Sequence, residues 1–233
     1  MATTITIAAR FNGPRESGNG GYSAGLLAAA VGGPAVVSLR SPVPLDRPLD
    51  VVVAADGVTR ALDGDVLVME AQPAEALDLE PPRAVTVAEA RAAEERYRGL
   101  DDGPFSRCFV CGRARDDAFG VFAGRLDGDG LVATTWTPDG RAAGDDGMVA
   151  PEFVWSVLDC PTYFALYDDP ATLSFLASLQ VRIDANVRVG AEHVVVAWPI
   201  GRDGRKHLAG GAVLSADGAT LAVGRALLIA ARG

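Results

Sequence analysis

Residues 37–53 read VSLRSPVPLDRPLDVVV, and residues 179–196 read LQVRIDANVRVGAEHVVV. With one inserted residue, Arg40 aligns with Arg182, and the three valines that end the first stretch align with the three that end the second. In both copies an apolar run, a turn-forming stretch and a second apolar run follow one another, which predicts two strands joined by a turn. The sequence therefore contains an internal structural repeat.

Each copy of the repeat follows a stretch of helical character. Residues 21–31, GYSAGLLAAAV, end at Gly32-Gly33, and residues 151–167, PEFVWSVLDCPTYFALY, begin with a proline. Proline suits the first helical position, where no N–H is needed. Turn signals separate the further expected strands, which are 4–9 and 65–71 in the first half and 120–126, 131–137, 206–215 and 220–230 in the second. Each half is thus expected to be a helix followed by strands, with the first half shorter and degenerate.

The repeat divides the chain into three parts. We expect a shortened N-terminal unit over residues 1–73, a linker over 74–107 and a complete C-terminal unit over 108–233. In the linker, Thr86 and Glu89 have the spacing of a capping box, which predicts a helix over 87–98. The many charged residues of this helix indicate a solvated connector.

Composition narrows the class of protein. The chain has 233 residues, 49% of them hydrophobic, and a formal net charge of −9. This apolar content excludes a disordered chain, and the acidic balance argues against a nucleic-acid partner. No apolar run reaches the roughly 18 residues that cross a bilayer, and the first ten residues have no secretory pattern, so neither a membrane nor export is expected. Three cysteines make a disulfide framework improbable, and the expected localisation is cytoplasmic.

Two helical segments carry a family resemblance. Residues 19–27, NGGYSAGLL, resemble the [H/N]-G-G helix start of bacterial acyl-CoA thioesterases of the phenylacetyl-CoA type, which have the hotdog fold. Leu158-Asp159-Cys160 resembles the acid-bearing part of the same helix, and residues 204–222 resemble the last hairpin of the family. The resemblance implies an α+β double hotdog, in which two fused antiparallel sheets each wrap a helix.

The glycine turn has a chemical rationale. A helix N-terminus presents unpaired N–H groups and a partial positive charge. Because Gly20 and Gly21 lack side chains, a thioester carbonyl can approach these N–H groups, which would stabilise the oxyanion of a tetrahedral intermediate. Asn19 would cap the helix or donate its amide to the substrate. The alternative is that Asn19 and the glycines only form a tight turn.

The acid required by the resemblance lies in the other half. In these thioesterases an acidic residue follows the His or Asn of the turn by nine positions and acts as a general base or a nucleophile. Nine positions after Ala150 comes Asp159, whereas nine after Asn19 comes Ala28. We therefore expect one shared site that combines Asn19, Gly20 and Gly21 with Asp159. A solvated helix face around Asp159 is the alternative, and Glu152 is the second candidate for the acid.

The remaining candidates concern the substrate and metal chemistry. Tyr22 is expected to line an acyl pocket, and the basic cluster of Arg202, Arg205 and Lys206 is expected to bind the phosphates of coenzyme A. Cys108 and Cys111 form a CxxC, but zinc needs further ligands at a finger spacing, so the motif indicates only a turn. Cys160 is expected to be a small buried residue.

The sequence thus predicts an acyl-CoA thioesterase that uses no cofactor or metal, coenzyme A entering only as part of the substrate. A hotdog hydratase or dehydratase is a rival, although that chemistry usually needs an Asp–His pair and both histidines lie on late strands. A non-catalytic protein that binds an acyl ligand is the second rival. Association into a homodimer of double hotdogs stays open, and the acyl group and pathway are not encoded in any motif.

Overall fold

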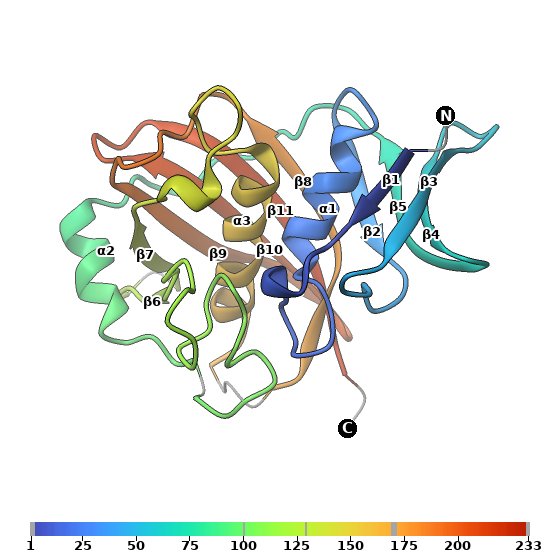
Figure 1. Cartoon of the computed structure of the whole chain (residues 1–233). Helices are drawn as coiled ribbons and strands as arrows, with labels where there is room; N and C mark the ends of the chain where they lie inside the picture. Colours follow the sequence, from blue (N-terminus) through green and yellow to red (C-terminus); the bar gives the residue numbers. More distant parts are fainter. Residues whose placement is uncertain (1–2, 100, 129, 169–171, 232–233) are drawn as a thin grey trace.

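The fold is one curved antiparallel sheet around two helices (Figure 1). The computed structural model describes residues 3–99, 101–128, 130–168 and 172–231, and within them it has eleven strands and three α-helices. The helices are α1 (Gly20–Ala29), α2 (Val87–Glu94) and α3 (Pro151–Leu166). The strands are β1 (Thr3–Thr6), β2 (Ala35–Leu39), β3 (Pro48–Val53), β4 (Thr59–Asp63), β5 (Val66–Pro73), β6 (Gly124–Arg125), β7 (Val132–Trp136), β8 (Ser174–Ile183), β9 (His193–Asp203), β10 (Lys206–Ser215) and β11 (Thr220–Ala230).

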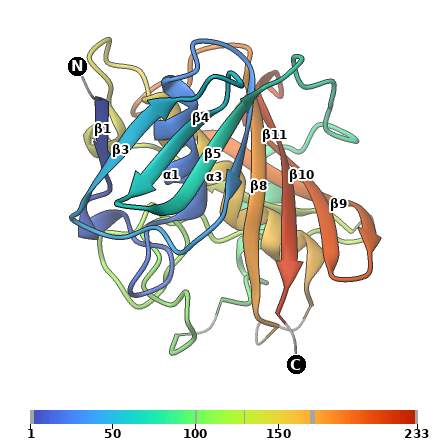
Figure 2. The same ribbon diagram turned by 90° about the vertical axis from the view of Figure 1, so that its right-hand side faces the viewer.

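The two halves of the sheet have the same strand order. From one edge the order is β1-β3-β4-β5-β2, and from the other edge it is β6-β7-β9-β10-β11-β8. β1 of the first half therefore corresponds to β7 of the second, and α1 corresponds to α3. The four strands that follow each helix also correspond in order, and β6 is an additional strand of the second half. The halves join where β2 pairs antiparallel with β8, Val37 lying opposite Leu179. In Figure 2 the blue-to-green strands of the first half lie beside the orange-to-red strands of the second.

Close contact between α1 and α3 fills the concave side of the sheet. Two glycines one helical turn apart make this contact possible, because a Cβ on Gly21 would lie 2.5 Å from the Trp155 carbonyl oxygen and a Cβ on Gly25 would lie 2.7 Å from the Glu152 Cα. Apolar side chains of both helices join those of the sheet in one core, which includes Leu27 and Leu158. The two helices are thereby fixed relative to each other.

The first half is more complete than expected. The sequence predicted four strands there, but the structure has five, because Thr59–Asp63 forms β4 between β3 and β5. This strand was missed because TRALD contains no apolar run; only Thr59 and Ala61 of it are buried. The prediction of a degenerate first half is therefore wrong in strand number, although each strand of the first half is shorter than the strand at the equivalent position of the second half.

The linker helix is not a solvated connector. The capping box of Thr86 and Glu89 forms as predicted, but α2 ends at Glu94 and packs on the sheet. Its buried Ala90 and Ala93 contact a second core cluster that includes Val196. Along β9, Val196 and Val195 point to opposite faces, Val195 into the core of α1 and α3, so α2 covers the outer face.

The division of the chain into residues 1–73, 74–107 and 108–233 stays a prediction. Residues 1, 2, 100, 129, 169–171, 232 and 233 of these parts lie outside the described residues. Among the residues that the structure describes, no helix is long and apolar enough to cross a membrane.

Candidate active site

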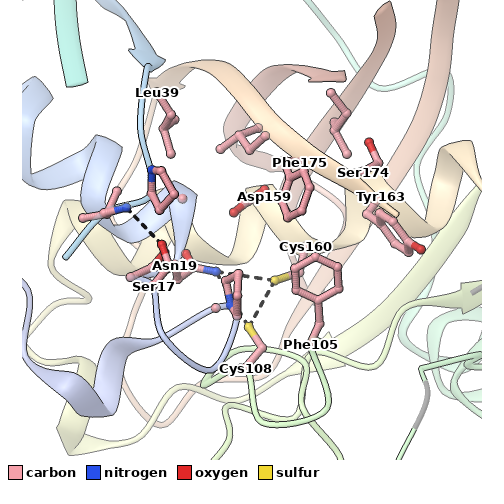
Figure 3. A pocket seen from close by; sticks show the side chains of 18 of the residues that line it. Ser17, Asn19, Leu39, Phe105, Cys108, Asp159, Cys160, Tyr163, Ser174 and Phe175 are labelled. Carbon is pink, nitrogen blue, oxygen red and sulfur yellow. Dashed lines mark hydrogen bonds between the residues drawn. The ribbon is translucent and has the colours of Figure 1, made fainter. Parts of the chain in front are cut away.

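A cavity of about 450 Å³ lies between the two halves of the chain. Its lining is mostly apolar, with side chains of the first half facing side chains of the second. The first half supplies Pro14, Leu39, Pro42 and Val43, and the rest of the chain supplies Phe105, Tyr163, Phe164, Phe175, Leu176 and Leu228. The size and the apolar walls are typical of a small-molecule site. Figure 3 shows part of this lining from close by, with Leu39 and Phe175 of the apolar wall and the polar side chains of Asp159 and Asn19.

Asp159 is the carboxylate that lines the cavity. It lies in the middle of α3, half-buried, and its Oδ2 accepts a hydrogen bond of 2.9 Å from the Gly21 N–H. Burial raises the pKa of the Asp159 carboxyl to about 7, with the Gly21 N–H acting in the opposite direction. A carboxyl group with this pKa is poised to exchange protons near neutral pH, as a general base requires.

The two glycines have different roles in the structure. Gly21 donates its N–H to Asp159 and packs against α3, so it does not offer a free donor to a substrate. Gly20 provides the first N–H of α1 and lines the cavity, and no residue in the described part of the chain accepts a hydrogen bond from it. A Cβ on Gly20 would lie 2.9 Å from Leu176 Cδ2 and 3.3 Å from Asp159 Oδ2. The expectation of two oxyanion donors therefore reduces to one, at Gly20.

Asn19 caps α1 and also faces the cavity. Its Oδ1 accepts a hydrogen bond of 2.9 Å from the Tyr22 N–H, which is the N-cap arrangement. This bond fixes the direction of the amide, so that Nδ2 lies 3.8 Å from Cys108 Sγ and 3.7 Å from Cys160 Sγ (Figure 3). The expected roles of this side chain were helix cap and substrate donor. The structure shows the cap, and the Asn19 Nδ2 donates to the two sulfur atoms.

The cysteines form a group that the sequence did not reveal. Cys108, Cys111 and Cys160 all line the cavity, and their Sγ atoms lie within 4.8 Å of one another. Hydrogen bonds from Cys111 and Cys160 hold the pKa of the Cys108 thiol well below its usual value, and the Cys108 contact raises the pKa of the Cys160 thiol. Cys160 is half-buried rather than enclosed in the core. No spacing rule connects residue 160 to a CxxC some fifty positions earlier.

The structure does not bring the predicted substrate-binding residues to the cavity. Tyr22 is buried in an aromatic cluster, stacked on Phe11 with ring centroids 4.4 Å apart, and is absent from the cavity wall. Arg202, Arg205 and Lys206 are exposed on the β9–β10 hairpin and do not line the cavity. Their clustering reflects a solvated turn of the hairpin.

Arg40 is the basic residue of the cavity wall, and sequence reasoning used it only to align the repeat. It directly follows β2, its side chain is half-exposed, and it forms an ion pair with Glu70. A guanidinium group in this position can meet an anionic part of a ligand. The only sequence signal for Arg40 was its alignment with Arg182 in the repeat. Arg182 does not line the cavity, and it forms ion pairs with Glu80 and Asp184, so the alignment does not predict a shared role.

Comparison with solved structures identifies the architecture. The tesB protein of Mycobacterium avium subsp. paratuberculosis superimposes with a TM-score of 0.62 at 16% identity, over 98% of this chain and 92% of that chain. A conserved protein of unknown function with hot dog fold from Alicyclobacillus acidocaldarius superimposes with a TM-score of 0.61 at 14% identity, over 99% and 93%. No protein-family model matches, and no curated protein is similar in sequence. By its structure, the chain has the hotdog fold.

Proposed function

We propose that the chain hydrolyses a thioester of an apolar acyl group, with Asp159 as the general base and the Gly20 N–H as the oxyanion donor. The observation that carries the proposal is the position of the Asp159 carboxylate, which lies in an apolar cavity beside the first N–H of a helix. A carboxyl pKa of about 7 is consistent with this role. We also propose that the chain is two fused hotdog units, because its halves repeat one strand order.

The proposed reaction needs only water and the thioester. Asp159 takes a proton from a water molecule, and the resulting hydroxide adds to the carbonyl carbon. The negative charge on the carbonyl oxygen is stabilised by the Gly20 N–H and the positive end of the α1 dipole. The carbon–sulfur bond then breaks, and the proton held by Asp159 passes to the leaving thiolate. The products are a carboxylic acid and a free thiol.

Coenzyme A is the thiol that the resemblance implies, and the proposal assigns its phosphates to Arg40 because this guanidinium lines the cavity. The apolar walls favour an aliphatic or aromatic acyl group rather than a charged one. Hydratase chemistry has less support, because neither histidine of the chain lines the cavity: His193 is buried beside Trp136, and His207 lies beside Tyr167.

The test is release of free thiol from a panel of aliphatic and aromatic acyl-CoA esters. We expect turnover by the wild-type chain and a loss of about 10²–10⁴-fold in Asp159→Asn, which is the usual contribution of a general base. Glu152→Gln is the matched control, because Glu152 also lies on α3 but outside the cavity wall. Saturable binding of the esters with no thiol release would instead identify an acyl-binding protein, and equal loss in both variants would remove the role of Asp159.

A further inference from the structure

All three cysteines of the chain meet at one point of the cavity wall. Cys108 and Cys111 belong to the segment between α2 and β6, whereas Cys160 belongs to α3. The free thiols of Cys108 and Cys111 are buried, and that of Cys160 is half-buried. The proposed thioester hydrolysis uses none of them. A group of three thiols at one place therefore calls for a role of its own.

The spacing of the sulfur atoms fits a metal ion. Cys108 Sγ and Cys160 Sγ are 3.7 Å apart, and all three Sγ atoms lie within 4.8 Å of one another. A zinc ion with tetrahedral geometry and Zn–S bonds of about 2.3 Å holds its sulfur ligands about 3.8 Å apart. We propose that Cys108, Cys111 and Cys160 bind a thiophilic metal ion of the zinc class, with the fourth coordination position open to the cavity.

Hydrogen-bond donors already surround the sulfur atoms. The Asn19 Nδ2 lies within 3.8 Å of both Cys108 Sγ and Cys160 Sγ, and the Val110 N–H donates to Cys108 Sγ at 3.5 Å. Metal ligation requires thiolates, and N–H donors stabilise the negative charge that each sulfur gains. The donors come from the N-cap of α1 and from the CxxC turn, and α3 supplies Cys160, so three separate segments of the fold converge on this cluster.

The CxxC turn is held in shape before any ion binds. The Gly112 N–H donates to the Cys108 carbonyl at 2.8 Å, and a Cβ on Gly112 would lie 2.5 Å from the Cys108 nitrogen. The Tyr97 hydroxyl donates to the Cys111 carbonyl at 2.6 Å. An ion on the three sulfurs would tie this turn to α3 and fix one wall of the cavity. Each ligating thiol would release its proton to solvent.

The test is titration of the reduced, metal-free chain with Co²⁺ in the absence of oxygen, followed by displacement with Zn²⁺. We expect one Co²⁺ per chain, with an intense thiolate-to-cobalt charge-transfer band and the visible bands of tetrahedral cobalt, and release of protons on binding. Zn²⁺ should remove these bands and protect the thiols from an aromatic disulfide reagent. Because these measurements use the wild-type chain, they do not depend on how any variant folds.

The variants assign the ligands. Cys160→Ser keeps the CxxC but removes the α3 ligand, and it should lose the tetrahedral cobalt spectrum. Ser106→Ala is the matched control, because Ser106 is buried in the same segment and its hydroxyl lacks a partner among the described residues, yet all three thiols remain. Asp159→Asn should keep the cobalt spectrum while thiol release from acyl-CoA falls by about 10²–10⁴-fold. Failure of the metal site and failure of the proposed hydrolase are therefore separate results.

Three results would overturn the proposal. The wild-type chain could show only the weak bands of octahedral cobalt, which would assign the ion to surface carboxylates. The charge-transfer band could survive in Cys160→Ser, which would exclude the third ligand. The chain could also reject both ions and lose two free thiols in air, which would identify the cluster as a dithiol that forms a disulfide.

Discussion

α1 and α3 are the equivalent helices of two halves that share one strand order, yet they begin differently. The Asn19 side chain caps α1 and Gly20 provides its first N–H, whereas Ala150 offers α3 no side-chain cap and Pro151 has no N–H to give. Nine positions after these cap residues, α1 has Ala28 and α3 has Asp159. Each helix therefore has one part of the proposed site that the other lacks.

The different starts of α1 and α3 explain why one cavity contains both the N–H groups of a helix start and the Asp159 carboxylate. The start of α1 packs against the middle of α3, and the Gly21 N–H reaches the Asp159 carboxylate across this contact. At the start of α3, the position equivalent to Gly21 is Glu152, an acid whose charge the helix dipole favours. A repeated fold can thus divide its chemistry between its two copies. Four experiments test whether the two helices differ in this way.

The largest expected effect is on the pH dependence of thiol release. Because burial raises the pKa of Asp159 to about 7, the carboxylate form is lost as the pH falls through 7. Activity of chelator-treated protein should therefore be about 100-fold lower at pH 5 than at pH 8, since a single base loses tenfold per pH unit. The initial rate is measured together with circular dichroism, which checks that the chain stays folded. A flat profile would contradict a role for this carboxyl group.

The next effect is on stability. A carboxyl whose pKa is raised on folding binds more protons in the folded state, so the free energy of unfolding falls as the pH rises from about 4 to 7. A pKa raised from 3.8 to about 7 corresponds to at most about 4 kcal/mol, and the partial solvent exposure of Asp159 reduces this. We expect Asp159→Asn to be about 2 kcal/mol more stable than the wild type at pH 8, and the difference to vanish near pH 4. Urea unfolding at both pH values measures it, and equal stability at pH 8 would show that folding leaves this pKa unchanged.

A third experiment tests the close approach of the two helices. Gly21→Ala would place its Cβ 2.5 Å from the Trp155 carbonyl oxygen and 2.7 Å from Asp159 Cβ, so the helices must move apart. We expect a loss of about 1–3 kcal/mol in the free energy of unfolding, the usual cost of overpacking. Gly33→Ala is the control, because no atom lies within 4 Å of the added Cβ. Equal stability of the two variants would mean that the helices do not constrain each other.

The smallest effect concerns the two caps. Asn19→Ala removes the acceptor of the Tyr22 N–H and should cost about 1 kcal/mol. Ala150 has the extended backbone of an N-cap residue, so Ala150→Asn should stabilise α3 by up to about 1 kcal/mol. Thermal unfolding of both variants measures the change in melting temperature that each substitution causes. A lower melting temperature for Asn19→Ala and a higher one for Ala150→Asn would show that the N-cap side chain stabilises α1 and that α3 lacks this stabilisation. Shifts of the same sign would contradict this difference between the two helix starts.

Local patterns account for most of the secondary structure. The ends of β10 and β11 and the start of α3 were predicted at the observed residues, because turn signals and Pro151 mark them clearly. β4 was missed because TRALD has too few apolar residues to be recognised without its neighbours. The packing of α2 was missed because its buried Ala90 and Ala93 are small and its other residues are charged.

Asn19, Gly20 and Asp159 could be proposed as parts of one site because the sequence contains the repeat and because the resemblance to hotdog thioesterases implies the nine-residue spacing. The sequence likewise determined that the chain has two related halves, since apolar periodicity and turn residues act over short distances. Three features are visible only in the folded chain: the Gly21 N–H donates to Asp159, Tyr22 packs in the core, and Cys160 lies beside Cys108 and Cys111. These contacts depend on how α1, α3 and the segment before β6 pack, and packing joins residues that no local pattern connects.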